Sequence, residues 1–292
     1  MDVQTPRGAI VVGVDSSPDS DLAVRWALHH ARHGHLPVHL VHVQPPPPPY
    51  VGDDSARERW RQAGQDVLDR ALAGAEHVRG VPVTSESLHD AMAATPDALL
   101  QACAEASLLV VGARGHGELS GLLIGSVSQY AARHAPCPVV AVRVQADPEA
   151  QRVVVGVDTS EGGEDALALA FELAAHRRAS LTAIRAWHAP SLPGVGVTLP
   201  MPSDVSDQLT SQKQVLGDQL LPWELKYPAV RVTREVVPGH PGEVLTHASE
   251  RAALVVVGSR GRSALTGMLL GSVSQEVLRH AKCPVAVSPP PR

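Results

Sequence analysis

The chain carries one segment twice. When the 292-residue sequence is shifted by 146 positions, Ala106 to Val139 aligns with Ala252 to Val285, and 21 of the 34 aligned positions are identical. Near the start of each repeat the shift is 143, so the second repeat has gained three residues in between. Duplication explains this pattern, and it predicts two domains of one fold. The two domains are copy one (residues 1–145) and copy two (152–292), and a polar linker (146–151) joins them.

Each copy has the same glycine pattern after an apolar run. The pattern is G-x2-G-x9-G-S, and its glycines are Gly112, Gly115 and Gly125 in copy one and Gly258, Gly261 and Gly271 in copy two. A buried strand, a glycine-rich loop and a helix start are the parts of an anion site, because glycines admit a ligand close to the backbone and the helix start offers free N–H groups. Hydroxyl donors at the predicted helix starts favour an anion with several oxygens: Ser126, Ser128, Ser272 and Ser274. A single copy is also consistent with a tight turn, but unchanged spacing in two copies favours the anion site.

Composition narrows the classes of fold and partner. Hydrophobic residues make up 44% of the chain and aromatic residues only 3%, so the core is built from Ala, Val and Leu, which favours helices packed on parallel strands. A net charge of -5 provides no basic field for nucleic acid or an anionic membrane. The start of the chain lacks the features of a signal peptide and no apolar run approaches about 18 residues, so we expect a cytoplasmic protein. Three cysteines without a CxxC pair are expected to be reduced.

Strand-like and helix-like segments alternate in both copies. This order predicts the α/β class, with a doubly wound, five-stranded parallel sheet and right-handed crossovers in each copy. The predicted strands of copy one are 9–14, 36–43, 81–88, 107–111 and 138–144, and those of copy two are 152–157, 181–187, 230–236, 253–257 and 284–287. The predicted helices of copy one are 19–32, 53–76, 96–104 and 126–134. A proline run at 45–49 and a Pro/Gly-rich segment at 188–204 are expected to be connectors, the second either a lid or disordered.

One aspartate follows the first strand of each copy. Asp15 and Asp158 share a crevice with the glycine loop if the strand before that loop lies next to the first strand, because ligands of open α/β sheets sit beyond the carboxyl ends of the strands. An aspartate after a strand also caps helices, and the nearby residues Ser16, Ser17 and Asp19 have the same capacity.

Together these residues resemble the universal stress protein family in its tandem form, over nearly the whole chain. The likeness rests on the strands ending in Asp15 and Asp158, the glycine pattern, and the Ser-Val-Ser motifs at 126–128 and 272–274. This glycine pattern is similar to that of the ATP-binding branch of the family. The resemblance therefore implies a fold like that of the adenine-nucleotide α-hydrolases, which is Rossmann-like, with ATP and Mg²⁺ as ligands.

The resemblance also implies which residues surround the nucleotide. Asp15 would lie beside the adenine with Val43 as an apolar wall, the first glycine loop would line the ribose and α-phosphate, and residues 125–127 would hold the outer phosphates. The implied site of copy one is Gly13, Asp15, Val43, Val111, Gly112, Arg114, Gly115, Gly125, Ser126, Val127 and Ser128. That of copy two is Gly156, Asp158, Ala186, Val257, Gly258, Arg260, Gly261, Gly271, Ser272, Val273 and Ser274.

Two differences between the copies predict unequal sites. Copy two has Gly239-His240-Pro241-Gly242 in the turn after its third strand, where many relatives show Gly-x-Pro, but copy one has Ala93-Ala94-Thr95-Pro96. Ala186 replaces Val43 and removes roughly 1 kcal/mol of apolar burial from the adenine wall of copy two.

The main hypothesis is an ATP-binding regulator or sensor of the stress response that acts with little or no hydrolysis through a protein partner not identified by the sequence. The loop segments His116-Gly117-Glu118 and Arg262-Ser263-Ala264 share no general base, although Glu118 leaves weak hydrolysis open. The alternative is an adenylating or ATP-hydrolysing enzyme of the adenine-nucleotide α-hydrolase type, but Gly13 to Ser17 lacks the Ser-Gly-Gly-x-Asp-Ser motif of the adenylating enzymes.

A third hypothesis is a scaffold with a purely structural nucleotide. The resemblance implies that the last strands, 138–144 and 284–287, join domains or form a homodimer, since an uncovered apolar edge strand invites aggregation. The choice between ATP and cyclic AMP is open.

Overall fold

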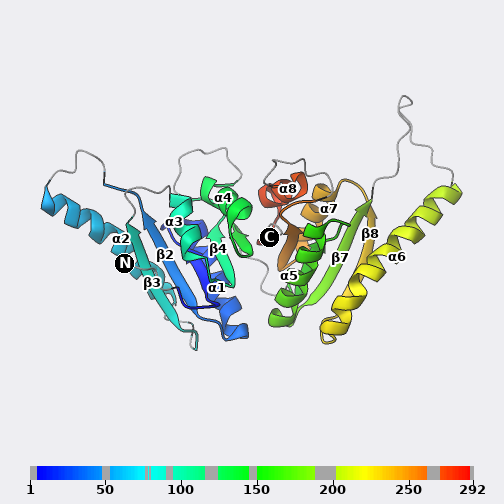
Figure 1. Ribbon diagram of the computed structural model, residues 1–292, viewed down its shortest axis with the longest axis horizontal. Helices are drawn as coiled ribbons and strands as arrows, with labels where there is room; N and C mark the ends of the chain where they lie inside the picture. The colour runs from blue at the N-terminus through cyan, green and yellow to red at the C-terminus, as the bar shows by residue number, and fades with distance from the viewer. Residues whose placement is uncertain are drawn as a thin grey trace, which may run out of the picture. The chain divides into compact units, whose positions relative to one another are not determined.

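The computed structural model describes residues 5–47, 53–75, 78, 80–89, 95–115, 124–144, 150–187, 202–261 and 270–289. Its internal contacts divide the chain into two compact units, Met1–Gln145 and Ala146–Arg292 (Figure 1). Some of the predicted features fall outside the described residues: Pro48 and Pro49 of the proline run, most of the linker, the turn at 90–94, the connector at 188–201, and the loop interiors 116–123 and 262–269.

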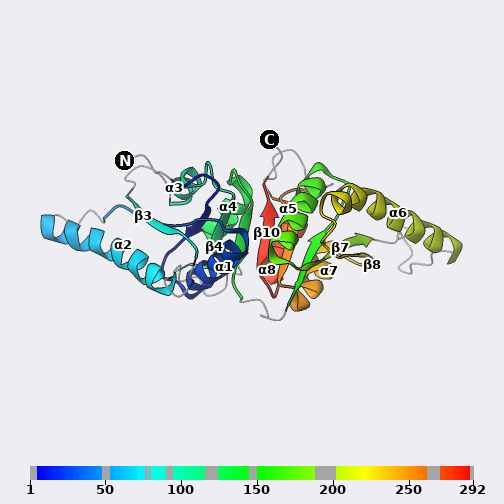
Figure 2. The ribbon, with the colours of Figure 1, turned by 90° about the horizontal axis from the view of Figure 1, so that it is seen from below.

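Copy one forms a five-stranded parallel sheet with the strand order β3-β2-β1-β4-β5. Its strands are β1 (Ile10–Gly13), β2 (Val38–Gln44), β3 (Val83–His89), β4 (Leu108–Gly112) and β5 (Val139–Val142). Its helices are α1 (Pro18–Gly34), α2 (Asp54–Ala75), α3 (Thr95–Ala102) and α4 (Ser126–His134). Helices α1 and α2 pack together on one face of the sheet, and α3 and α4 lie together on the other (Figure 2).

Copy two repeats this arrangement with the order β8-β7-β6-β9-β10. Its strands are β6 (Arg152–Gly156), β7 (Ser180–Trp187), β8 (Val232–Pro238), β9 (Leu254–Gly258) and β10 (Val285–Ser288). Its helices are α5 (Glu161–Arg177), α6 (Pro202–Lys226), α7 (Pro241–Ala248) with the 3-10 turn η1 (Ser249–Arg251), and α8 (Ser272–His280). The predicted fold, two doubly wound α/β sheets, is confirmed.

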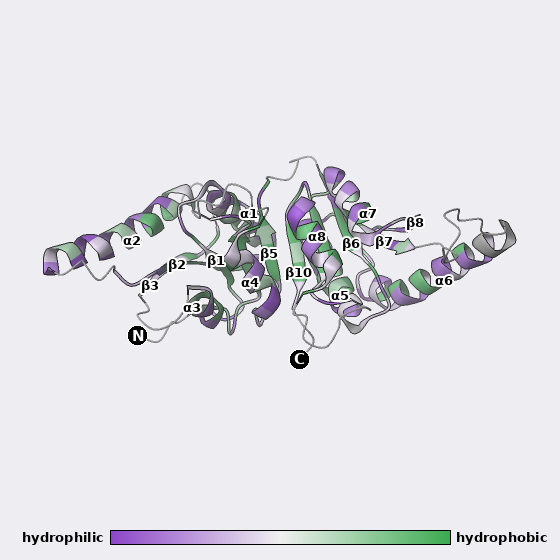
Figure 3. Ribbon diagram, turned by 90° about the horizontal axis from the view of Figure 1, so that it is seen from above, coloured by the Kyte–Doolittle hydropathy of each residue, from purple (hydrophilic) through white to green (hydrophobic). Residues whose placement is uncertain are grey.

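Both cores consist mainly of aliphatic side chains on the central strands. Val11 and Val110 in copy one and Val154 and Val255 in copy two are fully buried, as expected for parallel strands covered on both faces. Figure 3 shows hydrophobic colour on β5 and β10 and mixed colour along α2 and α6. No helix within the described ranges is long and apolar enough to cross a membrane.

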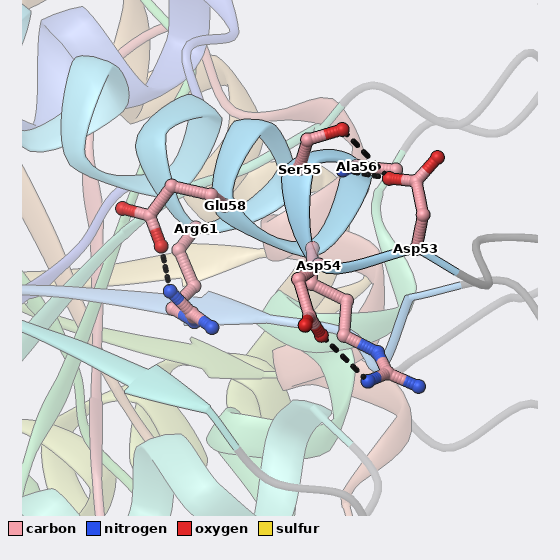
Figure 4. Close-up of polar contacts among 7 residues, drawn as sticks. Asp53, Asp54, Ser55, Ala56, Glu58 and Arg61 are labelled. Atoms are coloured by element: carbon pink, nitrogen blue, oxygen red, sulfur yellow. Dashed lines mark hydrogen bonds and ion pairs between the residues drawn. The ribbon is translucent and has the colours of Figure 1, made fainter.

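Helix α2 begins one residue later than predicted because Asp53 is its cap. Its Oδ1 atom accepts hydrogen bonds from the Ala56 amide (2.5 Å) and the Ser55 hydroxyl (2.8 Å) (Figure 4). These bonds favour the charged carboxylate and lower the pKa of Asp53. Two exposed ion pairs lie on the first turns of α2, Asp54–Arg57 and Glu58–Arg61.

Replacing Gly217 by alanine is expected to stabilise copy two. Gly217 lies inside α6, and a β-carbon built on it meets nothing within 4 Å. Alanine would reduce the entropy of the unfolded chain without a clash, which favours folding by about 0.5–1 kcal/mol. Chemical denaturation of the variant would reveal this as a raised midpoint with an unchanged slope. An unchanged or lowered midpoint would contradict it.

Candidate functional site

The aspartates and glycine loops leave the same edge of each sheet. Strand β1 pairs with β4, with Gly13 opposite Val111, and β6 pairs with β9 in the same way. The strand order reverses between these two strands, and this is where open α/β sheets have their ligand crevices. The adjacency on which the shared crevice depends is therefore present in both copies.

In copy one, the Asp15 carboxylate faces the first glycine loop (Gly112–Gly115). A β-carbon added to Gly115 would overlap its Oδ2 atom, while its Oδ1 atom accepts a hydrogen bond from the Ser17 amide at 3.0 Å. The side chain that caps α1 is Ser17, which accepts from the Ser20 amide at 3.2 Å. Since Ser17 is the cap, the carboxylate of Asp15 remains directed toward the loop.

Copy two repeats this geometry around the second glycine loop (Gly258–Gly261). Asp158 Oδ1 accepts from the amide of Ser160 at 3.0 Å and from its hydroxyl at 2.5 Å. Asp158 Oδ2 lies 2.9 Å from a β-carbon built on Gly261. Ser160 also caps α5 by accepting from Gly163 N at 3.2 Å. The two serine caps thus orient the two aspartates alike.

Four of the predicted site glycines serve packing within the protein. A β-carbon on Gly112 would lie 2.8 Å from the backbone of Asp19 and Ser20, and one on Gly258 would lie 2.6 Å from the Gly162 carbonyl oxygen. Because they have no side chain, Gly112 lets the start of α1 pack directly on its loop, and Gly258 does the same for α5. Gly13 and Gly156 admit a leucine, since their β-carbons would meet Leu99 of α3 at 3.0 Å and Leu245 of α7 at 2.6 Å.

Ser128 and Ser274 differ from the prediction in their partner. They were expected to offer hydroxyl donors to an anion, but their Oγ atoms donate to the carbonyls of Gly112 (2.6 Å) and Gly258 (2.5 Å). Both side chains are buried. They hold the glycine loop against the helix start, because a buried hydroxyl requires a partner and the carbonyl supplies it.

The starts of α4 and α8 have the properties of an anion site. Gly125 and Gly271 are the capping residues, and neither helix has a side-chain cap among the described residues. Their own amides donate back to Ala113 O (2.6 Å) and Ser259 O (2.8 Å), so each helix start is held close to its loop. The next N–H groups, from Ser126 or Ser272 onward, lie at the positive end of the helix dipole.

Copy two contains a cavity of about 830 Å³ at this edge. All eleven residues predicted for copy two line it: Gly156, Asp158, Ala186, Val257, Gly258, Arg260, Gly261, Gly271, Ser272, Val273 and Ser274. In copy one the corresponding residues lie at the same places: Gly13 at the end of β1, Val43 on β2, Val111 and Gly112 on β4, and Ser126 and Val127 on α4. The volume lies within the range of small-molecule sites.

Sequence reasoning missed part of the cavity wall. Ile184, Trp187 and Leu245 line it together with Ala186. Ala186 has a smaller side chain than Val43, and Ile184, two residues earlier on β7, shares its face of the sheet, whereas Trp187 points to the opposite face. In copy one the position of Trp187 is taken by Gln44, whose amide donates to the Trp60 carbonyl on α2. The isoleucine two positions before Ala186 was the available signal in the sequence.

A buried arginine links this wall to Asp158. Arg185 is 6% exposed and donates from Nε to Gln212 Oε1 (2.5 Å) and from Nη1 to Gln219 Oε1 (3.3 Å). Gln219 in turn donates to the Asp158 carbonyl at 2.9 Å. Helix α6 therefore contributes to the site through side chains that have no counterpart in the repeated motif.

Charged groups gather around the first glycine loop. Asp19 Oδ2 accepts from the Arg114 amide at 3.0 Å, and burial raises the pKa of Asp19 despite this bond. Burial, and then the charge of Arg114, lower the pKa of Arg143 nearby. Within the described parts of the chain, no three His, Cys, Asp or Glu side chains cluster as metal ligands.

Comparisons with known proteins agree on one family. The model of the Universal stress protein family matches residues 7–143 and 149–289. Universal stress protein Rv2623 of Mycobacterium tuberculosis is 39% identical in an alignment 298 residues long that covers 96% of this chain and 95% of that protein. Universal stress protein Mb2028c of Mycobacterium bovis is 36% identical in an alignment 297 residues long that covers 96% of each chain.

A solved structure shows the same fold over both copies. The crystal structure of a universal stress protein from Archaeoglobus fulgidus superposes with a TM-score of 0.71, covering 98% of this chain and 99% of that chain. The two sequences are 19% identical, so the likeness concerns the fold.

Proposed function

The chain belongs to the universal stress protein family, and we propose that each copy binds ATP and that the bound state regulates a protein partner in the stress response. The observation that carries the proposal is the cavity of copy two, about 830 Å³ in volume, which is lined by all eleven residues that the family resemblance implied for it. Its lining combines the parts that a nucleotide requires, namely an apolar wall, a carboxylate, a glycine loop and a helix start.

Each part of the nucleotide has suitable residues in copy two. Ile184 and Ala186, which share one face of β7, offer an apolar surface to the base, and Asp158 offers an acceptor to its amino group or to the ribose hydroxyls. The second glycine loop suits the ribose and the first phosphate. The segment from Gly271 to Val273 suits the outer phosphates, because backbone N–H groups at a helix start favour negative charge.

Mg²⁺ fits this site as a companion of the phosphates. The described residues hold no cluster of three acidic, His or Cys ligands, and Mg²⁺ commonly takes phosphate oxygens and water with few protein ligands. Ser272 lines the cavity at the start of α8, and its hydroxyl is the side-chain oxygen that we propose joins such a set. Bound Mg²⁺ would neutralise phosphate charge.

A regulatory role agrees with how Asp158 is held. It is the one carboxylate among the described residues that line the cavity, and its Oδ1 atom is engaged by both polar groups of Ser160. Its Oδ2 atom faces Gly261, on the ribose side of the proposed nucleotide, whereas the outer phosphates are assigned to the start of α8. A general base would have to lie beside the water that attacks the last phosphate. We therefore propose little or no hydrolysis. We also propose a cytoplasmic homodimer with an interface through the edge strands β5 and β10.

The test is to identify the nucleotide released from the denatured protein and to titrate stripped protein with Mg²⁺-ATP and with cyclic AMP. Gly271→Ala should remove binding by copy two, because its methyl group would occupy the helix start assigned to the outer phosphates. The domain should stay folded, since the nearest protein atoms lie 3.6 Å from that methyl group. Calorimetry should then count one nucleotide per chain in place of two. Gly74→Ala is the matched control, because the α2 residue Gly74 faces open space.

The outcomes separate the hypotheses. Failure of the wild type to carry or take up any adenine nucleotide would contradict the proposal. Steady release of ADP would favour a hydrolase. If removal of the nucleotide changed neither the size of the oligomer nor the binding of protein partners, the scaffold would be favoured.

A further inference from the structure

The first glycine loop is clamped to the start of α1 by two side chains. The Arg114 amide donates to Asp19 Oδ2 at 3.0 Å, and the Arg114 carbonyl accepts from the Ser17 hydroxyl at 3.1 Å. Both backbone polar groups of the residue that precedes Gly115 are therefore held by the first turn of the same helix. Asp19 is partly buried beside Gly112, whose missing β-carbon makes room for it.

Copy two lacks this clamp within its described residues. Asp19 corresponds to Gly162, which has no side chain to offer, and an added β-carbon there would lie 2.5 Å from the Arg260 carbonyl oxygen. Ser17 corresponds to Ser160, whose hydroxyl donates to Asp158 at 2.5 Å. The second glycine loop is thus packed against α5 without side-chain bonds equivalent to the two that hold Arg114.

A buried hydroxyl in the second loop supports the same contrast. Ser259 is fully buried, and its Oγ atom has no hydrogen-bond partner in the part of the chain that the structure describes, whereas copy one has Ala113 at that place. A buried hydroxyl without a partner costs free energy. This cost favours rearrangement of the second loop when a ligand offers new contacts.

We propose that Asp19 is a positioning residue that holds the first glycine loop in its binding conformation, and that the second loop, which lacks these bonds, loses more conformational freedom on binding, so the two sites bind nucleotide unequally. This inference rests on the proposed nucleotide function. A loop already held in place loses less conformational freedom on binding, and the saving appears as affinity. Copy one is accordingly the site with the smaller entropic penalty.

Hydrogen exchange of the nucleotide-free protein tests the clamp directly. The amides of Arg114 and Gly115 should exchange more slowly than those of Arg260 and Gly261. Asp19→Ala should speed exchange at Arg114 roughly tenfold, because a hydrogen bond to a charged group is removed. Asp19→Asn retains an oxygen acceptor of the same shape and should restore part of the protection.

Nucleotide titration in the Gly271→Ala background then isolates copy one. Asp19→Ala should weaken binding there roughly tenfold, with partial recovery for Asp19→Asn, while the domain stays folded. Asp21→Ala is the control, since it removes an exposed acid from the same first turn of α1.

The two proposals fail in different ways. Wild-type affinity of copy one in Asp19→Ala, or equal exchange of the two loops, would overturn this inference while leaving the nucleotide function intact. Absence of nucleotide binding by both copies of the wild type would contradict the proposed function itself, and the inference with it.

Discussion

Gly115→Ala is expected to weaken nucleotide binding by copy one at least about tenfold while the domain stays folded. The added methyl group would overlap Asp15 Oδ2 and turn the carboxylate away from the crevice, which removes a hydrogen bond to a charged group. The backbone of Gly115 is not in the left-handed region, so alanine introduces no backbone strain there. Calorimetric titration in the Gly271→Ala background measures the effect.

Gly261→Ala in copy two provides a graded comparison. Its methyl group would lie 2.9 Å from Asp158 Oδ2, so a small shift of the carboxylate relieves the overlap, and we expect a smaller reduction of affinity than for Gly115→Ala. Gly74→Ala again controls for the substitution itself. Equal affinity of wild type and Gly115→Ala would show that Asp15 does not take part in binding.

Phe171→Ala is expected to lower the free energy of unfolding of copy two by about 3–5 kcal/mol. Phe171 is the single phenylalanine of the chain and is fully buried in α5. Its ring centroid lies 6.2 Å from that of Trp223 and 5.8 Å from that of Tyr227, so the change leaves a cavity beneath the end of α6. Urea denaturation followed by tryptophan fluorescence would measure the destabilisation.

The control for Phe171→Ala lies on the same end of α6. Leu225 is 75% exposed, so Leu225→Ala removes a similar apolar group without opening a cavity and should change stability by less than about 0.5 kcal/mol. A destabilisation below about 1 kcal/mol for Phe171→Ala would show that the core beside α6 collapses around the missing ring.

The positions of the strands were predictable from local sequence. Parallel strands covered on both faces are apolar runs such as Leu108 to Val111, and the structure ends β4 at Gly112, beside the predicted boundary. The serine caps were harder to assign, because Ser16, Ser17 and Asp19 all have capping chemistry. Only the folded backbone shows that Ser17 takes this role, while Ser16 adopts a φ of 64° and Asp19 bonds to Arg114.

The roles of individual glycines were less predictable. A glycine in a sequence indicates that a side chain is excluded, but the excluded neighbour is a matter of tertiary packing. Gly112 and Gly13 make room for α1 and α3, whereas Gly115 makes room for the Asp15 carboxylate. The same spacing therefore contains glycines with different partners.

Local patterns that occur twice in the sequence were sufficient for the duplication, the order of elements within each copy, the family and the residues expected at the carboxyl edge. The sequence also showed two differences between the copies, in the turn after the third strand and at Ala186 in place of Val43, but the contacts that differ between them became visible only in the folded chain. The clamp joins Asp19 to Arg114, which are 95 positions apart. The network from Arg185 through Gln219 to Asp158 includes a bond between residues 61 positions apart. Such contacts depend on how helices pack on the sheet, and no repeat or periodicity in the chain encodes them.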